Sequence, residues 1–192
     1  MILDNAAHRM HPVEEIAASF FTRRTACALL GAYAFVGGIV TLTGWFANVP
    51  RLTDWTGSGI SMLPNTAVCA AGAGAALVLL TFLRKRWPTL LLGSVVGSIG
   101  AATLFQYFTG IDLGIDRLLL ARDWGQYATV APGRMGPPAS ASWTIIGLAL
   151  VLASGGIKRR RAAVLCAVLA IAIGTLSIIG YLFGAQLLFT IP

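Results

Sequence analysis

Residues 64–108 read PNTAVCAAGAGAALVLLTFLRKRWPTLLLGSVVGSIGAATLFQYF, and this stretch decides the fold. The basic run Arg84-Lys85-Arg86 separates two apolar segments. Each segment is close to the roughly 20 residues that a helix needs to cross a bilayer. Basic residues concentrate in the short cytoplasmic loops of membrane proteins. The stretch therefore predicts a helical hairpin that crosses a membrane twice, with its turn in the cytoplasm.

The composition extends this prediction to the whole chain. Hydrophobic residues make up 57% of the 192 residues and charged residues only 11%, and the mean hydropathy is +0.79. A soluble globular protein has about 25% charged residues, which cover its surface. We therefore expect an all-α integral membrane protein whose solvent is lipid. The apolar segments predict five transmembrane helices, at about residues 25–46, 65–83, 88–108, 139–157 and 162–182.

The net charge of +7 comes mainly from clustered basic residues. Arg84–Arg86 and Lys158–Arg161 each lie between two apolar segments, and Arg23-Arg24 precedes the first one. A nucleic-acid-binding protein would instead spread basic residues over an exposed face of a soluble fold. The pattern predicts that all three groups lie on the cytoplasmic side of a bacterial inner membrane, and it excludes nucleic acid as a partner.

This orientation divides the chain into a tail and a membrane domain. Residues 1–24 are expected to form a cytoplasmic tail, in which the stretch after Pro12 predicts a short interfacial helix. The transmembrane domain then spans residues 25–192. Its outer loops, 47–64 and 110–138, and the final residue Pro192 are expected on the periplasmic side.

Several kinds of chemistry are excluded by the residues that are missing from the helices. The only histidines, His8 and His11, lie in the tail, so no transmembrane helix can supply an imidazole ligand to haem. A Ser-His-Asp or Cys-His arrangement is excluded for the same reason. No ionisable residue lies in the core of a predicted helix, which argues against proton-coupled transport. We predict no enzyme activity, no catalytic residue, no metal site and no cofactor, while a bound lipid or pigment remains open.

The sequence also repeats itself. Residues 62–67, MLPNTA, return 73 positions later as residues 135–140, MGPPAS, and each copy leads from an outer loop into a helix. Proline suits the first helical turn because its missing N–H has no intrahelical partner there. Asn65 and Thr66 are expected to cap the free N–H groups beside it. The predicted helix-start residues are Met62, Pro64, Asn65, Thr66, Met135 and Pro137.

The helices that run outward repeat as well. Small residues recur at matching depths in the first, third and fifth helices, which predicts close helix packing. The expected packing residues are Gly38, Gly93, Gly97, Gly100 and Gly174. The pattern of outward helix, loop and inward helix occurs twice and then begins a third time. The incomplete third unit predicts a groove lined by Gly93, Gly97, Gly100 and Gly174 that could hold a partner helix, lipid or pigment.

The second outer loop carries a resemblance to a known family. Residues 110–119, GIDLGIDRLL, and 132–137, PGRMGP, resemble the membrane input region that precedes PAS, histidine-kinase and diguanylate-cyclase modules in bacterial signalling proteins. The family motif Gly-Arg-Met-x-Pro-Asn-Thr-Ala is kept in part by both copies of the repeat. The resemblance covers about residues 25–190 and implies a sensory membrane domain. No kinase or cyclase signature occurs in these residues. The chain would signal through a partner if it is complete, and the alternative is that it is a fragment of a longer signalling protein.

The outer loops hold the candidate binding residues. Asp112 and Asp116 are four residues apart, so a short helix would place them on one face, with Arg117 beside them. The candidate ligand- or partner-binding residues are Asp112, Asp116, Arg117, Arg134 and Trp55. The competing interpretation is a solvated loop with internal salt bridges. Two functions follow: a sensory input domain, or an accessory subunit of a larger photosynthetic or respiratory membrane complex. The expected partners are membrane lipids and other membrane proteins or further copies of the chain.

Overall fold

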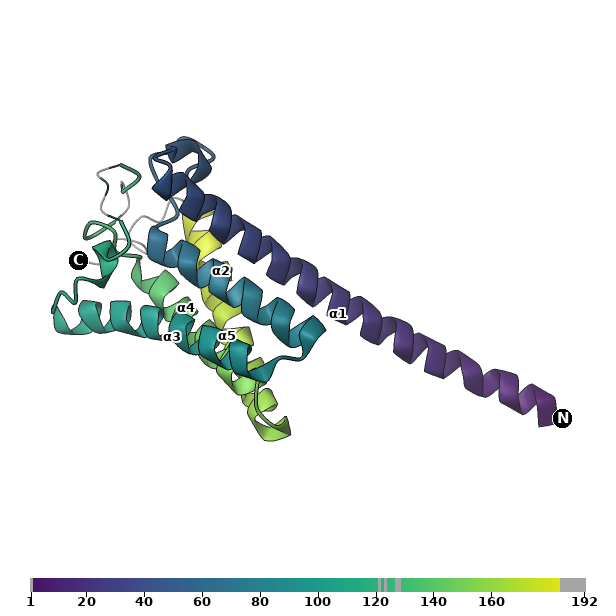
Figure 1. The fold of residues 1–192 in the computed structure, drawn as a ribbon. Helices are drawn as coiled ribbons and strands as arrows, with labels where there is room; N and C mark the ends of the chain where they lie inside the picture. Colours follow the sequence, from purple (N-terminus) through teal and green to yellow (C-terminus); the bar gives the residue numbers. More distant parts are fainter. Residues whose placement is uncertain (1, 121, 123, 127–128, 184–192) are drawn as a thin grey trace.

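The computed structural model describes residues 2–120, 122, 124–126 and 129–183, with side chains from Thr22 onward except that of Tyr181. Within that part of the chain, all regular structure is helical, as the sequence predicted. Figure 1 shows a bundle from which the N-terminal half of the first helix projects. The main helices are α1 (Ile2–Phe46), α2 (Pro64–Val78), α3 (Arg86–Thr109), α4 (Pro137–Ala153) and α5 (Ile157–Leu182).

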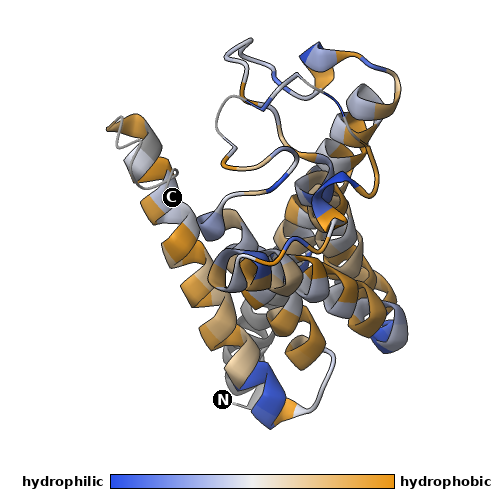
Figure 2. Ribbon diagram, turned by 90° about the vertical axis from the view of Figure 1, so that its left-hand side faces the viewer, coloured by the Kyte–Doolittle hydropathy of each residue, from blue (hydrophilic) through white to orange (hydrophobic). Residues whose placement is uncertain are grey.

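Four helical segments of the described chain are long and apolar enough to cross a membrane. The fifth apolar helix, α4, is shorter, with 17 residues. The ribbon in Figure 2, coloured by hydropathy, is hydrophobic along much of the length of the helices. The architecture is therefore that of a membrane-embedded helical protein. The four spans are Thr22–Phe46, Pro64–Leu83, Arg86–Thr109 and Ile157–Gly180.

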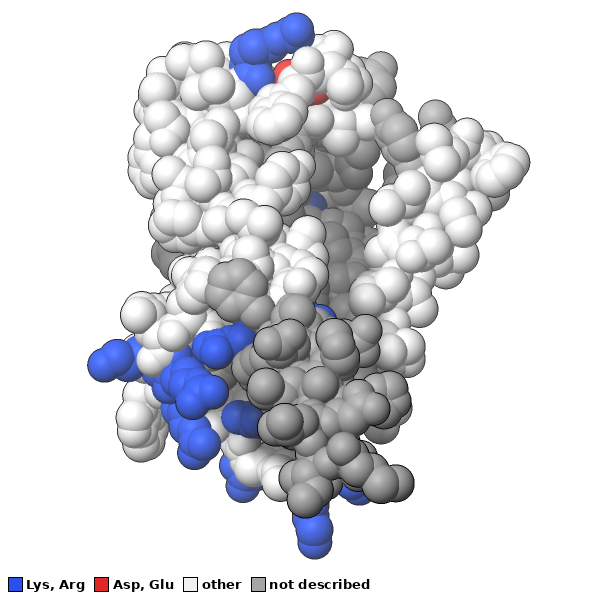
Figure 3. Space-filling model, turned by 90° about the vertical axis from the view of Figure 1, so that its right-hand side faces the viewer, with Lys and Arg blue, Asp and Glu red and all other residues white. Residues whose placement is uncertain are grey.

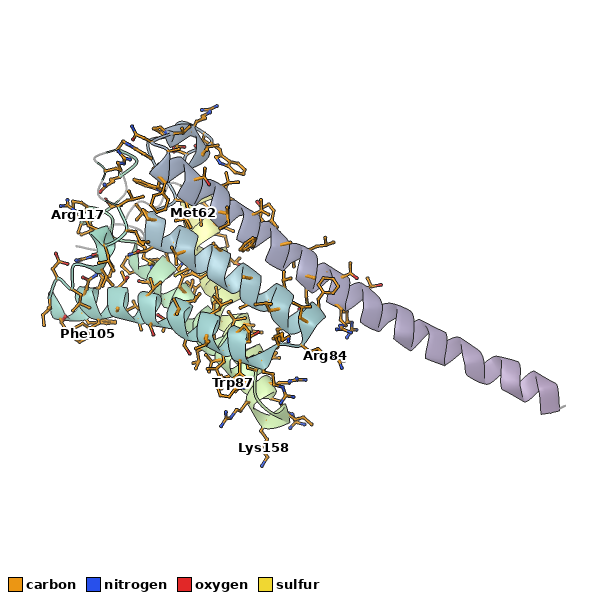
Figure 4. The ribbon with its side chains drawn as sticks, viewed as in Figure 1. Met62, Arg84, Trp87, Phe105, Arg117 and Lys158 are labelled. Carbon is orange, nitrogen blue, oxygen red and sulfur yellow. The ribbon has the colours of Figure 1, made fainter. Side chains whose placement is uncertain are left out.

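The two ends of the bundle differ in charge. Lys and Arg side chains gather at one end, as Figure 3 shows, and we name it the basic end. Arg84 and Lys158 mark this end in Figure 4, whereas Met62 and Arg117 lie at the opposite end, where the long loops are. We name that opposite end the loop end. At the basic end Arg24 Nη2 of α1 donates to the Thr81 carbonyl oxygen at 2.5 Å.

Helix α1 is longer than the sequence indicated. It begins at Ile2 and continues without a break to Phe46, so residues 2–21 are helical ahead of the span that begins at Thr22. Pro12 is the one proline in this stretch, and no glycine occurs before Gly31. The helix continues through Pro12, although proline has no N–H to donate to the preceding turn.

Helix α4 ends earlier than predicted, at Ala153 instead of near residue 157. The turn is Ser154-Gly155-Gly156, and the Ser154 hydroxyl donates to the Leu150 carbonyl oxygen at 3.0 Å. Glycine costs about 1 kcal/mol relative to alanine inside a helix, whereas lysine and arginine are good helix formers. The basic run Lys158–Arg161 therefore lies within the first turns of α5, and the prediction that it forms the turn was wrong.

The contacts between α1 and α2 recur between α3 and α4. A Cβ atom on Gly38 would lie 2.6 Å from the Ala67 carbonyl oxygen, and one on Gly100 would lie 2.7 Å from the Ser140 carbonyl oxygen. Ala67 and Ser140 are 73 residues apart, the offset of the sequence repeat. Both helix pairs thus need glycine at this depth because the partner backbone occupies the space of a side chain.

The α1–α2 and α3–α4 contacts also match nearer the basic end. A Cβ atom on Gly31 would lie 3.0 Å from the Gly74 carbonyl oxygen, and one on Gly93 would lie 3.1 Å from the Gly147 carbonyl oxygen. Gly74 and Gly147 are again 73 residues apart. Helices α1 and α3 therefore each meet the helix that follows them, α2 or α4, at two matched levels. These contacts make α1–α2 and α3–α4 two similar hairpins.

Two predictions about the glycines need correction. Gly93, Gly97 and Gly100 line no open groove, because all three face α4. No described atom beyond its chain neighbours and its own helix backbone lies within 4 Å of a Cβ atom placed on Gly174, so this glycine packs against no helix in the described part of the chain. The sequence alone could not distinguish these cases, because Gly174 in α5 matches Gly100 in α3 at an offset of 74 residues.

Candidate functional site

Arg134 pairs with two aspartates at the loop end. Its Nε donates to Asp116 Oδ2 at 2.7 Å, and its Nη2 donates to Asp112 Oδ1 at 3.3 Å. The Asp116 side chain is 6% exposed and the Arg134 side chain 14% exposed, whereas the Asp112 side chain is 75% exposed. Arg117 is exposed and takes part in neither ion pair. Three of the predicted site residues thus come together.

The segment that carries the aspartates is a tight turn and not the short α-helix that their spacing suggested. Residues Ile115–Arg117 form the single 3₁₀ turn η3, which Gly114 precedes with φ of 67°. Opposite this turn Gly133 has φ of 78°, and a Cβ atom there would lie 2.5 Å from the Asp116 carbonyl oxygen. Only glycine suits this position, because other residues rarely adopt positive φ and would clash.

Helix α3 anchors the ion-pair cluster through its last turn. The Gln106 side chain is buried; its Nε2 donates to Asp116 Oδ2 at 2.9 Å, and its Oε1 accepts the Leu113 N–H at 2.7 Å. The neighbouring Tyr107 donates its hydroxyl to the Met135 carbonyl oxygen at 3.2 Å. Its ring centroid lies 5.8 Å from the Arg134 guanidinium carbon, within cation–π range.

The helix starts follow the repeat, but the predicted caps are wrong. Pro64 and Pro137 are the first residues of α2 and α4, as expected. Neither Asn65 nor Thr66 caps α2, because the N-cap position belongs to Leu63 and no side chain bonds there. A cap must precede the first helical residue. Pro64 is the first helical residue, so Asn65 lies inside the helix. The Asn65 side-chain amide instead donates to the carbonyl oxygen of Ile115, at 3.0 Å.

The two outer loops join into one cap over the loop end. The indole rings of Trp45 and Trp124 stack with centroids 4.2 Å apart and an interplanar angle of 11°. Trp124 Nε1 donates to Asn48 Oδ1 at 3.0 Å, and the Ser61 N–H donates to the Gly125 carbonyl oxygen at 3.0 Å. The two hydrogen bonds connect loop 47–64 to loop 110–138, and the stack attaches loop 110–138 to the end of α1. The loops therefore do not move independently.

Asp54 organises the first outer loop. Its Oδ2 accepts the Gly59 N–H at 2.6 Å, and its Oδ1 accepts the Gly57 N–H at 2.9 Å and the Thr56 hydroxyl at 3.0 Å. Burial raises the pKa of Asp54, but these hydrogen bonds outweigh it, so the pKa lies below its usual value. The predicted site residue Trp55 stands beside this turn, 64% exposed and outside the Arg134 cluster.

A pocket of about 200 Å³ opens between the two loops and the starts of α2 and α4. Its walls combine apolar side chains with Arg134 and with three hydroxyl-bearing residues, Ser61, Thr66 and Thr129. The walls come from both repeat copies, because Met62 and Met135 both contribute. The lining residues are Ile60, Ser61, Met62, Leu63, Thr66, Gly125, Thr129, Arg134, Met135, Gly136 and Ala139.

Met62 and Met135 hold matched positions in this pocket. Trp45 Nε1 donates to the Met62 carbonyl oxygen at 2.8 Å, just as the hydroxyl of Tyr107 donates to the Met135 carbonyl oxygen. The Met135 side chain is buried with Trp45 and Leu63 in a small apolar core. The last turn of α1 thus fixes the segment that leads into α2, and the last turn of α3 fixes the segment that leads into α4.

Sequence reasoning missed Gln106, Asp54 and the Trp45–Trp124 stack. Gln106 offered one signal, since it is a polar residue in the last turn of an apolar helix. Its partner, Asp116, is only 10 residues away. The stack joins residues that no local pattern connects. The predicted Pro192 lies outside the described residues, so its side of the membrane is not addressed by the fold.

Metal binding and known relatives give no further lead. Among the described residues no three His, Cys, Asp or Glu side chains gather in a metal-binding group. Comparisons with protein families, curated proteins and solved structures find no match. The class that fold and site define is therefore a membrane-embedded helical protein with a structured cap and pocket at one end.

Proposed function

We propose that the protein is a sensory input protein of a bacterial inner membrane, which binds a small molecule in the pocket at its loop end. The pocket itself is the observation that carries this proposal. It lies between the starts of α2 and α4, so a bound molecule would contact both hairpins at once. In this proposal all five helices cross the membrane, the basic end faces the cytoplasm and the loop end faces the periplasm.

The pocket's lining suggests the chemistry of its ligand. Ligand sites combine mostly apolar walls with a few polar groups, and drug-sized ligands need roughly 300–1,000 Å³. A pocket of about 200 Å³ suits a smaller molecule. Arg134 already pairs with two carboxylates, so its charge is largely compensated. The expected ligand is therefore a small, mainly apolar molecule with one polar group near Ser61 or Thr129.

A thermal-unfolding screen tests this proposal. The purified protein in detergent is heated with indole, hexanoate and similar small apolar molecules that each carry one polar group. A ligand that binds only the folded state raises Tm according to its concentration and affinity. We expect at least one such molecule to raise Tm in the wild type. The increase should disappear in Ala139→Phe, which fills the pocket, and persist in Val130→Phe, which alters an exposed loop residue.

The screen can also reject the proposal. If no small molecule of this class raises Tm, or if the Ala139→Phe variant responds like the wild type, the pocket is not a ligand site. The Val130→Phe control separates a blocked pocket from a general loss of stability. Since both variants place phenylalanine at the loop end, a difference between them reports on the pocket.

A second function is favoured by a different observation. Only 6% of the span within α5 is buried, compared with 28% of α3. Such an exposed helix would suit an accessory subunit of a larger photosynthetic or respiratory complex. Purification of the tagged protein from its native membrane in mild detergent distinguishes the two functions. Stoichiometric recovery of a complex supports the subunit, whereas recovery of the protein alone supports the sensor.

A further inference from the structure

The basic end carries two groups of cations that belong to different helices. Residues 84–86 connect the second span to α3, and residues 158–161 lie in the first turns of α5. We name these seven residues the basic patch. All of their side chains are exposed. Within the described part of the chain, none of these side chains forms an ion pair or a hydrogen bond, so no described group compensates their charge.

Other arginines of the protein are held by protein partners. Arg134 at the loop end pairs with two aspartates. Arg24, on α1 at the basic end, donates to the Thr81 carbonyl oxygen. The basic patch differs from both, because its charge is available to a partner outside the described chain.

The packing of α3 on α4 brings the two halves of the patch to one level. A Cβ atom on Gly93 would lie 3.2 Å from the Val151 nitrogen. Since the two helices run antiparallel, the start of α3, two turns before Gly93, lies near the turn of residues 154–156 from which α5 begins. A Cβ atom on Gly155 would lie 2.5 Å from Arg159 Cδ, so the stem of Arg159 lies against this turn. The halves of the patch therefore flank the end of α4.

The starts of α3 and α5 add to the positive charge of the patch. Neither helix has an acidic residue in its first turn, and no side chain caps α3. The N-terminus of a helix carries a partial positive charge. Figure 3 shows Lys and Arg side chains gathered at this end, whereas the Asp and Glu atoms visible on the same face lie at the opposite end. The patch is therefore a strongly positive surface.

Apolar side chains border the patch on the side of the membrane-spanning segments. Trp87 follows residue 86 and Ile157 precedes residue 158, and each is 76% exposed. Figure 4 shows Trp87 and Lys158 at the same end of the bundle. Exposed tryptophan is typical of the membrane–water interface, where lipid headgroups lie. A dissolved anion would neutralise the patch but leave Trp87 and Ile157 in contact with water, whereas a phospholipid would cover both.

We propose that the basic patch binds an anionic phospholipid of the surrounding leaflet. Its phosphate lies between residues 84–86 and 158–161, and its acyl chains lie against Trp87 and Ile157. Basic clusters at the ends of membrane-spanning helices attract anionic headgroups. A zwitterionic lipid fits less well because the patch repels the cation of its headgroup. This inference requires that the helices lie in a membrane, but it does not depend on the loop-end pocket or its ligand.

Quenching of Trp87 fluorescence by brominated lipids tests the proposal. The purified protein in detergent is titrated with phosphatidylglycerol that carries bromine on its acyl chains, and separately with brominated phosphatidylcholine. The signal of Trp87 is the difference between the wild type and Trp87→Phe. Each basic residue near an anionic surface contributes about 1 kcal/mol, or about fivefold in affinity. We expect half-maximal quenching at a phosphatidylglycerol concentration at least about fivefold below that of phosphatidylcholine.

Two double variants of equal net charge locate the effect. Arg86→Gln with Arg159→Gln removes one cation from each half of the patch. It should raise the phosphatidylglycerol concentration for half-maximal quenching by about 25-fold, about fivefold for each cation. Arg51→Gln with Arg117→Gln removes two exposed cations at the loop end and should leave this concentration unchanged. Circular dichroism and gel filtration of each variant establish that it is folded.

Three results would overturn the proposal. The first is equal quenching of Trp87 by the two lipids. The second is an Arg23→Gln variant that weakens quenching as much as Arg159→Gln, because the lipid would then respond to the charge of the whole end and not to the patch. The third is displacement of phosphatidylglycerol by inorganic phosphate, beyond that by chloride at equal ionic strength, which would make the patch a site for a free anion. None of these results affects the small-molecule screen, so the two proposals fail separately.

Discussion

The two ion pairs of Arg134 should contribute very differently to stability. Asp116 Oδ2 lies 2.7 Å from Arg134 Nε, and both side chains are at least 86% buried, since they are 6% and 14% exposed. Asp112 Oδ1 lies 3.3 Å from Nη2, but its side chain is 75% exposed. Removing one partner of a buried pair costs about 3–5 kcal/mol, whereas exposed pairs contribute roughly 0–1 kcal/mol.

Double-mutant cycles measure this difference directly. One cycle combines Asp116→Asn with Arg134→Gln, and the other combines Asp112→Asn with the same Arg134→Gln. We expect a coupling free energy of about 2–3 kcal/mol for Asp116 and below about 0.5 kcal/mol for Asp112. Unfolding is followed in detergent by titration with SDS. The fluorescence of the stacked Trp45 and Trp124 reports on the loop end, and circular dichroism reports on the helices.

Equal coupling free energies in the two cycles would refute this reasoning, since burial would then not distinguish the pairs. A coupling free energy near zero between Asp116 and Arg134 would also refute it. The hydrogen bond from Gln106 to Asp116 offers an internal control. Gln106→Leu leaves the charge pair in place, so Asp116→Asn should remain costly in that background. If Asp116→Asn does not change the stability of the Gln106→Leu variant, Asp116 is held by the Gln106 amide and not by the Arg134 guanidinium.

Three further predictions concern other parts of the molecule. Gly100→Leu should destabilise the protein by about 2 kcal/mol or more, because the partner backbone fills that space, while Gly174→Leu should change stability by less than about 0.5 kcal/mol in the same SDS titration. The pKa of Asp54 should lie below the usual aspartate value, which the NMR shifts of its amide donors can measure, and its stabilising effect should be lost as the pH falls through that lowered pKa. Trp124→Leu should cost about 1 kcal/mol and free the loops, measured as faster hydrogen exchange.

The helices could be predicted because their causes are local. Apolar length, basic turns and proline at the first helical position each act within a few residues, and Pro64 and Pro137 begin their helices as expected. The end of α4 was misjudged for a local reason too. The pair Gly155-Gly156 was counted as part of an apolar segment, although glycine is a weak helix former.

The loop end could be predicted only in part, because its contacts connect distant residues. Asn65 donates to Ile115, 50 residues away, and Trp124 donates to Asn48, 76 residues away. Asn65 looked like a cap because asparagine commonly caps helices near such prolines. Its actual partner exists only after the two hairpins have packed and brought their loops together. The spacing of residues in the sequence therefore indicated which residues belong to the loop end, but it did not indicate which residues they contact.

The repeat explains how the bundle forms its loop-end pocket. One hydrogen bond from the end of α1, from Trp45 to Met62, fixes the start of α2. The equivalent bond from the end of α3, from Tyr107 to Met135, fixes the start of α4. Two such starts side by side enclose the pocket.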